Sequence, residues 1–373
     1  MSIPLLPEMR ERLPLIEPRG PGGDLEADGT VDPAAFEKWL APYGPWETRA
    51  DWAMPGQDAS VEGDDGTGGG PWEVEVSDAE VAGPHGPIAV RIYTPVPVNQ
   101  DDEAAVAGRP ALVWAHGGAF IHGDLDMPES HAVGLGVAGR AGAVVVSVDY
   151  RLCDVPDGFD PAGHRPNPGG QSGVHAPIPL DDLMAGLAWV RERSGDSGVD
   201  PDKIAVGGAS AGGCLAAAAH LRAAREGFPL AFAAPIYPVI HAAMPASTPE
   251  EAHDLALVPP PLGFDPVKVR VMNENYAGGP LEGVGPEVFP GEITAEALAA
   301  LHARSPLAPV YLESAQFDDL RPSARRWAEQ LAEAGVSVDY HVRQGVPHGT
   351  LNRRGIRTTP LTLEAIARRL AAL

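Results

Sequence analysis

The C-terminal three quarters of the chain alternates short apolar runs with segments that are apolar on one side only. ALVWAHG (111–117) and AVVVSVDY (143–150) are apolar at nearly every position, which is typical of strands buried on both faces. A later segment places Leu183, Leu187 and Val190 at the i, i+4, i+7 spacing of one helix face. Strands that alternate with helices predict a mainly parallel sheet covered by helices on both faces, and therefore an α/β fold.

The same pattern predicts an eight-stranded sheet. Two of the strands form a hairpin from EVEVSDAEV and PIAVRIYTP around a Gly-Pro-His-Gly turn. The others are expected at 111–117, 143–150, 203–209, 231–238, 309–316 and 336–344. Helices are expected after Pro128 and after Ser210, over 181–193, 322–335 and 359–372, and in shorter pieces over 266–276 and 294–302.

Long segments interrupt this alternation. Residues 1–71 are rich in proline, glycine and acidic side chains, and we expect them to form an N-terminal arm or cap element. Residues 153–179 form a long Pro/Gly-rich loop, and a larger excursion over 238–300 follows the sixth strand. Insertions after the carboxyl ends of strands lie beside the ligand crevice, so both should shape the pocket entrance. The core is then 72–237 together with 301–373, with 238–300 as a cap insertion.

The chain carries a large excess of acidic residues. Its formal net charge is −24 over 373 residues, which argues against binding nucleic acid or an anionic membrane through a basic patch. Cys153 and Cys214 do not suggest a disulfide framework. The segment MSIPLLPEMRERLPL makes a poor signal peptide, and no apolar run approaches the ~20 residues of a membrane helix. We therefore expect a soluble cytoplasmic protein.

One serine stands where a predicted strand meets a predicted helix, with only glycine and alanine around it. Gly208-Ala209-Ser210-Ala211-Gly212 fits the G-x-S-x-G nucleophile elbow, in which a tight turn projects the serine Oγ clear of the backbone. The amide of Ala211, at the helix start, could then help to hold a developing oxyanion. A glycine-rich turn with a chance serine would produce the same motif, so a nucleophile requires the other members of a triad.

A serine nucleophile needs a histidine base and a carboxylate that orients this base. His348 directly follows the last predicted strand, on a loop at the carboxyl edge of the sheet where Ser210 also emerges. The other histidines after Ser210 lie inside a helix, inside a strand or in the excursion after the sixth strand. Asp318 and Asp319 both follow the seventh predicted strand, so two carboxylates compete for the orienting role.

Some of the oxyanion donors are expected in the loop after the strand over 111–117. This loop reads His116-Gly117-Gly118-Ala119-Phe120, and paired glycines let backbone amides approach a substrate closely. An ordinary glycine turn after a buried strand would read the same way.

Ordered motifs in the chain resemble those of the hormone-sensitive-lipase-like esterases, which have the α/β-hydrolase fold. The resemblance covers roughly 85–373, and Ala119 replaces the third glycine of the family's HGGG signature. Ala209 replaces the acidic residue that precedes the family's nucleophile. The motifs are HGGAF (116–120), VVSVDYRL (145–152), GGASAGG (207–213), FDDLR (317–321) and PHG (347–349).

The resemblance implies roles for particular residues. It implies that Asp149 and Arg151 are structural and brace the oxyanion loop, and that the N-terminal arm and the excursion form a cap. The implied triad is Ser210 as nucleophile, His348 as base and Asp318 as orienting acid, with an oxyanion hole from the amides of Gly117, Gly118 and Ala211.

These observations favour a serine carboxylesterase that hydrolyses small to medium esters through an acyl-enzyme. The same triad would serve an amidase, a lactonase or a deacetylase of a specialised metabolite, and a non-catalytic small-molecule receptor could share the scaffold. No cofactor and no metal is expected, because no H-E-x-x-H motif, Cys/His cluster or P-loop spacing occurs. The expected partner is a small-molecule ester, without nucleic acid or membrane insertion, in a monomer or a homodimer.

Overall fold

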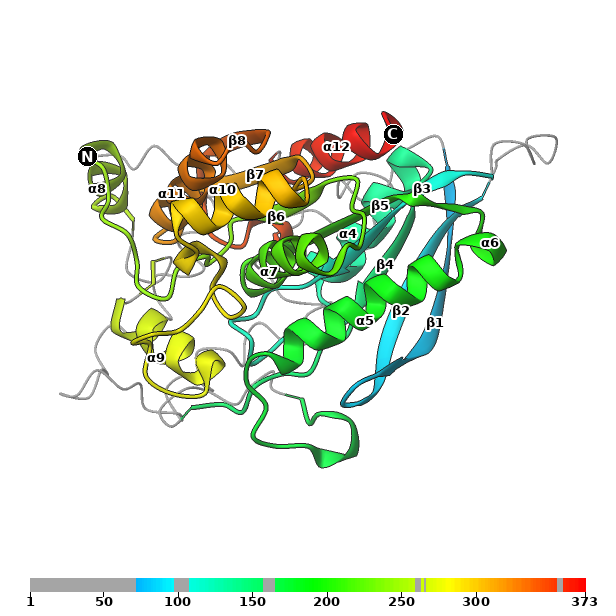
Figure 1. The fold of residues 1–373 in the computed structure, drawn as a ribbon, viewed down its shortest axis with the longest axis horizontal. Coiled ribbons are helices and arrows are strands. Elements are labelled where there is room, and N and C mark those ends of the chain that lie inside the picture. Colours follow the sequence, from blue (N-terminus) through cyan, green and yellow to red (C-terminus); the bar gives the residue numbers. More distant parts are fainter. Residues whose placement is uncertain (1–71, 97–106, 157–164, 259–262, 265, 354–357) are drawn as a thin grey trace, which may run out of the picture.

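An eight-stranded sheet forms the centre of the molecule (Figure 1). The strands follow the order β1-β2-β4-β3-β5-β6-β7-β8; β2 is antiparallel to both of its neighbours, and every other pair is parallel. The predicted mostly parallel sheet is therefore confirmed. The computed structural model describes residues 72–96, 107–156, 165–258, 263–264, 266–353 and 358–373, so the expected arm over 1–71 lies outside the described residues.

The elements fall close to their predicted positions. The strands are β1 (Glu73–Gly83), β2 (Gly86–Val96), β3 (Arg109–Ala115), β4 (Val144–Val148), β5 (Val199–Ala209), β6 (Ala233–Ile236), β7 (Val310–Phe317) and β8 (Val338–Pro347). The helices are α4 (Pro128–Ala141), α5 (Ile178–Glu192), α6 (Ser194–Ser197), α7 (Ala211–Glu226), α8 (Pro249–Leu255), α9 (Pro266–Ala277), α10 (Ala295–Arg304), α11 (Arg321–Glu333) and α12 (Thr358–Ala371). The sequence pattern predicts all of them except the short helices α6 and α8. Among the helices in the described ranges, none combines the length and apolar character needed to cross a bilayer.

Two helical layers cover the sheet, because successive strand residues point to opposite faces. In β3, Leu112 and Trp114 belong to the apolar cluster that includes α4 and α12, whereas Val113 and Ala115 belong to the cluster that includes α5 and α7. The β1–β2 hairpin lies at one edge of the sheet and β8 at the other (Figure 1). Burial on both faces explains why the parallel strands read as unbroken apolar runs.

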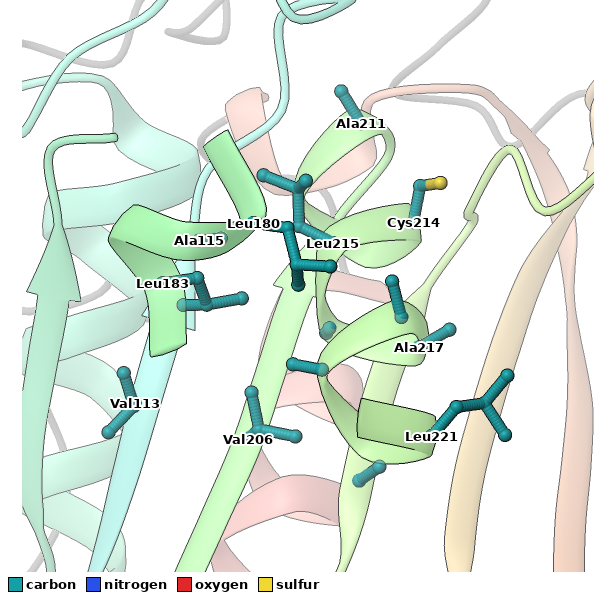
Figure 2. Packing of buried hydrophobic residues seen from close by; sticks show 14 of the residues in the cluster. Val113, Ala115, Leu180, Leu183, Val206, Ala211, Cys214, Leu215, Ala217 and Leu221 are labelled. Atoms are coloured by element: carbon teal, nitrogen blue, oxygen red, sulfur yellow. The ribbon is translucent and has the colours of Figure 1, made fainter. Parts of the chain in front are cut away.

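Helix α7 packs on β5, the strand that leads into it. Leu215 of α7 lies close to Leu180 and Leu183 of α5, with Val113 and Val206 of the sheet beneath them (Figure 2). All of these side chains are buried. This packing fixes the axis of α7 and therefore the position of the turn that precedes it.

The excursion after β6 is joined to the core through α8 by charged side chains. Arg321 of α11 donates to Asp254 at 2.8 Å, and Arg325 donates to Glu251 at 3.0 Å. A capping box between Thr248 and Glu251 starts α8, and this T-x-x-E pattern is the sequence signal that would have predicted the helix.

Helix α10 joins the core through apolar packing instead. Leu298 and Leu301 belong to the same buried cluster as Trp327 and Leu331 of α11. The expected boundary at residue 300 falls inside α10, which continues to Arg304. The helix runs past that boundary because its apolar side is part of the helical layer over the sheet.

Arg151 and Asp182 form a buried ion pair between the core strands and α5. Their side chains are 2% and 0% exposed. The guanidinium also donates to the carbonyl of His85, and Asp182 accepts from the amide of Arg151 at 2.9 Å. Arg151 therefore ties the β1–β2 turn to α5, and its described contacts do not include the oxyanion loop that the family resemblance led us to expect.

We expect Asp182→Ala to lower the free energy of unfolding by about 3–5 kcal/mol, because it leaves the Arg151 charge buried and unpaired. Urea denaturation followed by circular dichroism measures the change. The control is Asp78→Ala, which removes a more exposed partner of an arginine, Arg91, and should cost no more than about 1 kcal/mol. Equal losses in the two variants would contradict the prediction.

Buried histidines with uncharged partners bear on the stability of the fold. His116 stacks on Tyr150, His220 bonds the carbonyl of Ala308 at 3.0 Å, and His241 lies between Ser323 and Gln330. Burial lowers the pKa of His116 to about 3, and that of His220 and His241 to about 4. Since histidine in an unfolded chain has a pKa near 6.5, these side chains bind protons mainly after unfolding.

Stability should therefore fall as the pH drops from about 6.5 towards 4, because the unfolded chain takes up protons that the folded chain excludes. Urea denaturation at pH 7 and pH 5 tests this expectation. His220→Gln keeps a donor for Ala308 but removes one titrating group, so the difference between the two pH values should shrink. An unchanged difference in this variant would show that His220 does not contribute.

Candidate active site

Ser210 occupies a strained turn between β5 and α7. Its backbone has φ 54° and ψ −116°, and its amide donates to the carbonyl of Ile236 at 2.9 Å. A Cβ on Gly208 would lie 2.2 Å from the carbonyl oxygen of Gly212, and one on Gly212 would lie 2.1 Å from that of Ala115. Only glycine fits at these two positions, which explains the small residues of the motif.

The structure brings Ser210, His348 and Asp318 together from three separate loops. The Nε2 atom of His348 lies 2.9 Å from Oγ of Ser210, and its Nδ1 atom lies 2.8 Å from Oδ2 of Asp318. The second oxygen of Asp318 accepts from the amide of Leu320 at 2.9 Å. A continuous chain of hydrogen bonds therefore runs from a buried carboxylate to a serine hydroxyl.

Two aromatic rings contact the imidazole of His348. The rings of Tyr237 and Phe264 both meet it edge-on, with centroids 4.8 Å away. The histidine side chain is 11% exposed, so it remains accessible to a small molecule while its orientation is restricted.

Asp319 has a different partner from its neighbour. Its Oδ2 atom accepts from the amide of Phe264 at 2.8 Å, whereas only Asp318 bonds His348. Burial raises the pKa of Asp319, and the hydrogen bond from Phe264 opposes that effect. Asp319 thus attaches part of the excursion beside the imidazole, a role that we did not expect from the sequence.

The amide of Gly117 is not available as an oxyanion donor. It donates to Oε2 of Glu129 at 2.7 Å, so the sequence-based assignment of Gly117 is wrong for this structure. Within the described residues, the amides of Gly118, Ala119 and Ala211 have no hydrogen-bond acceptor. The donors available near Ser210 are therefore shifted one residue along the loop.

The loop after β3 is strained and tightly held. Ala119 and Phe120 both have positive φ, at 53° and 64°, which is uncommon for residues other than glycine. The ring of Phe120 stacks on Tyr276 of α9 with centroids 3.7 Å apart. Tyr150 donates its hydroxyl to the carbonyl of His116 at 2.8 Å.

Asp149 helps to hold the loop after β3 by pairing with Arg165, which lies in the 153–179 segment. Arg165 pairs with the Asp149 carboxylate and donates from Nε to the carbonyl of Gly123 at 2.9 Å. Burial raises the pKa of Asp149 to about 6, against the opposing charge of Arg165. The long loop therefore supports the segment after β3 in addition to any effect on the entrance.

Sequence reasoning missed Glu129, which lies behind this loop. Its side chain is 1% exposed, and Oε1 accepts from the hydroxyl of Tyr237 at 2.6 Å. Burial raises its pKa, whereas the donors from Tyr237 and Gly117 lower it. Acidic residues are common in the first turn of a helix, so the position of Glu129 in α4 carried no signal of its contacts.

The remaining histidines after Ser210 do not reach the serine. His220 and His241 bond groups elsewhere in the core, and His341 on β8 pairs with Asp339. In the part of the chain that the structure describes, no three His, Cys, Asp or Glu side chains are grouped as a metal ion would require.

Comparisons with known proteins agree with this geometry. Residues 173–352 match a family model described as the alpha/beta hydrolase fold, and residues 88–239 match that of the carboxylesterase family. The chain is 34% identical over 307 residues to esterase LipI of Mycobacterium tuberculosis, an alignment covering 81% of this chain and 82% of LipI. It is 33% identical over 292 residues to carboxylesterase NlhH of the same organism, with 77% of each chain covered.

A solved structure gives the same picture. An esterase of Pyrobaculum calidifontis superposes with a TM-score of 0.63 at 27% identity, covering 80% of this chain and 85% of that one. Identity of one third to LipI over about four fifths of both chains reflects common descent as well as shared architecture. The chain accordingly belongs to the hormone-sensitive-lipase-like esterases, carboxylic ester hydrolases of the α/β-hydrolase fold.

Proposed function

We propose that this protein hydrolyses small to medium carboxylic esters through an acyl-enzyme formed on Ser210. The observation that carries the proposal is the hydrogen-bond chain from Asp318 through His348 to the Ser210 hydroxyl. A serine hydroxyl is a weak nucleophile, and a neutral imidazole at 2.9 Å can remove its proton as the Oγ–C bond forms.

In the first half of the reaction, Oγ of Ser210 attacks the ester carbonyl and Nε2 of His348 takes the hydroxyl proton. Negative charge then develops on the former carbonyl oxygen, and the amides of Gly118, Ala119 and Ala211 would donate to it. The imidazolium returns its proton to the alcohol oxygen as the ester C–O bond breaks. An acyl-Ser210 ester and a free alcohol result.

In the second half, water replaces the alcohol. His348 removes a proton from this water as it attacks the acyl carbon, and then returns the proton to Oγ of Ser210 when the acid leaves. Asp318 supports both halves because it accepts the hydrogen bond that Nδ1–H of His348 donates. This tautomer leaves Nε2 free for the serine.

Apolar surroundings suit an uncharged ester. The rings of Tyr237 and Phe264 lie beside the imidazole, and the Phe120–Tyr276 stack lies beside the oxyanion loop. The names of LipI and NlhH describe an esterase and a carboxylesterase, which supports the same reaction here. We also propose that the part of the excursion between β6 and α10 acts as the cap over this site and that the enzyme works in the cytoplasm, as a monomer or a homodimer.

Ser210→Ala should abolish ester hydrolysis while leaving the fold intact, because it removes the nucleophile. We expect kcat to fall by about 10⁴-fold or more. Turnover of p-nitrophenyl esters of increasing acyl length, run beside an aryl amide, measures the loss and the preference between the two bonds. Activity within tenfold of the wild type, or an organophosphate adduct mapped to another serine, would rule out the proposal.

Asp318→Asn should lower kcat by about 10²–10⁴-fold, because an amide in that position favours the wrong histidine tautomer. The adjacent Asp319→Asn is the matched control. Its side-chain oxygen can still accept from Phe264, so we expect little change in kcat with p-nitrophenyl acetate. The assignment of the acid fails if Asp319→Asn is the more damaging substitution on the small ester.

A further inference from the structure

The carboxylate of Glu129 connects the loop after β3 with the loop that carries His348. One oxygen accepts from the amide of Gly117 at 2.7 Å, and the other accepts from the hydroxyl of Tyr237 at 2.6 Å. The amide of Glu129 itself donates to the side chain of Asn352 at 3.0 Å. Both oxygens of a buried acid are thus used by groups that surround the active site.

Tyr237 extends this connection to the imidazole. It follows β6 with a φ of 36°, and its amide donates to the carbonyl of Glu313 at 2.6 Å. Its hydroxyl accepts from the amide of Leu351 at 3.2 Å, and its ring meets the ring of His348 edge-on. One side chain therefore contacts Glu129, the imidazole and the backbone just beyond it.

Gly117 lies at the crowded centre of the arrangement. A Cβ on Gly117 would lie 2.2 Å from Oε2 of Glu129 and 3.1 Å from Cβ of Ser210. Glu129 and the nucleophile thus lie against the same glycine. Holding the amide of Gly117 fixes the orientation of the His116–Gly117 peptide plane, directly before the segment that carries the amides of Gly118 and Ala119, and so restricts the directions in which those amides point.

We propose that Glu129 and Tyr237 are positioning residues for ester hydrolysis. Together they fix the position of the oxyanion amides relative to His348 and Ser210. The inference rests on the proposed function of Ser210. A buried carboxylate is costly for the fold, and an apolar side chain of similar size is often at least as stable. The hydrogen bond between Glu129 and the amide of Gly117, the residue before the oxyanion donors, gives this acid a role in positioning those donors.

The gentlest test is Tyr237→Phe, which removes one hydroxyl and keeps the ring against His348. Tyr311→Phe is its matched control, because Tyr311 is also 1% exposed and also donates to a buried carboxylate, that of Glu313. We expect Tyr237→Phe to lower kcat about tenfold with KM within about twofold, since a small displacement of reacting groups has a large effect on rate. Tyr311→Phe should change neither constant by more than about twofold.

Two substitutions of Glu129 should lower kcat to different extents. Glu129→Gln keeps an acceptor for Gly117 but loses the hydrogen bond that Tyr237 donates, and should resemble Tyr237→Phe. Glu129→Ala frees the Gly117 amide and should lower kcat by about 10²-fold or more, in the range for removal of an oxyanion donor. Partial rescue by glutamine relative to alanine is part of the expectation. If the alanine variant does not fold, the Tyr237→Phe and Glu129→Gln variants decide.

The affinity for a trifluoromethyl ketone inhibitor distinguishes a positioning role from a purely structural one, because loss of a structural contact alone would leave this affinity unchanged. Such a ketone forms an adduct on the serine whose oxygen occupies the oxyanion position, so its affinity should weaken in proportion to kcat/KM in the Glu129 and Tyr237 variants. Wild-type kcat and inhibitor affinity in these variants, with only thermal stability lowered, would overturn the inference. Ser210→Ala run in parallel separates the cases: an active Ser210→Ala enzyme refutes the proposed function, whereas an inactive one beside unaffected Glu129 variants refutes only this inference.

Discussion

The close approach of the Ser210 turn to the end of β3 is the constraint on which the site depends. A Cβ on Gly212 would collide with the carbonyl of Ala115, so α7 can start where it does only because this position is glycine. The approach brings the first amide of α7 next to the loop that follows β3. The strained serine, the oxyanion amides and the imidazole then meet at one edge of the sheet, although the residues come from distant parts of the chain.

The predictable features of this molecule are the local ones. Unbroken apolar runs identify the parallel strands because burial on both faces leaves no polar positions in them. The Ser210 turn can be predicted because the close backbone contacts of the turn require small residues within two positions of the serine. The assignment of His348 rests on its place directly after a strand, since the carboxyl ends of parallel strands lie at one edge of the sheet. Strand position left Asp318 and Asp319 as competing acids, and the family resemblance selected Asp318.

The features that sequence reasoning missed depend on contacts across long separations. The residues around Glu129 in the sequence do not indicate that its side chain accepts a hydrogen bond from the amide of Gly117. Because of this hydrogen bond, the Gly117 amide is not available as an oxyanion donor. The role of Asp319 likewise depends on a backbone amide 55 residues away. The boundary at residue 300 was misplaced because the apolar positions of α10 predict a helix with one buried face, but they do not indicate which part of the protein covers that face.

The two ways in which the excursion is joined to α11 have a consequence for the solvent conditions of the enzyme. Helix α8 is held by arginine–carboxylate pairs, and added salt weakens such attractions to the extent that water reaches them. Helix α10 is held by leucine packing, which salts such as sulfate strengthen. A single insertion therefore contains two attachments with opposite responses to a salt such as sulfate, and the concentration of that salt should decide which end of the insertion loosens first.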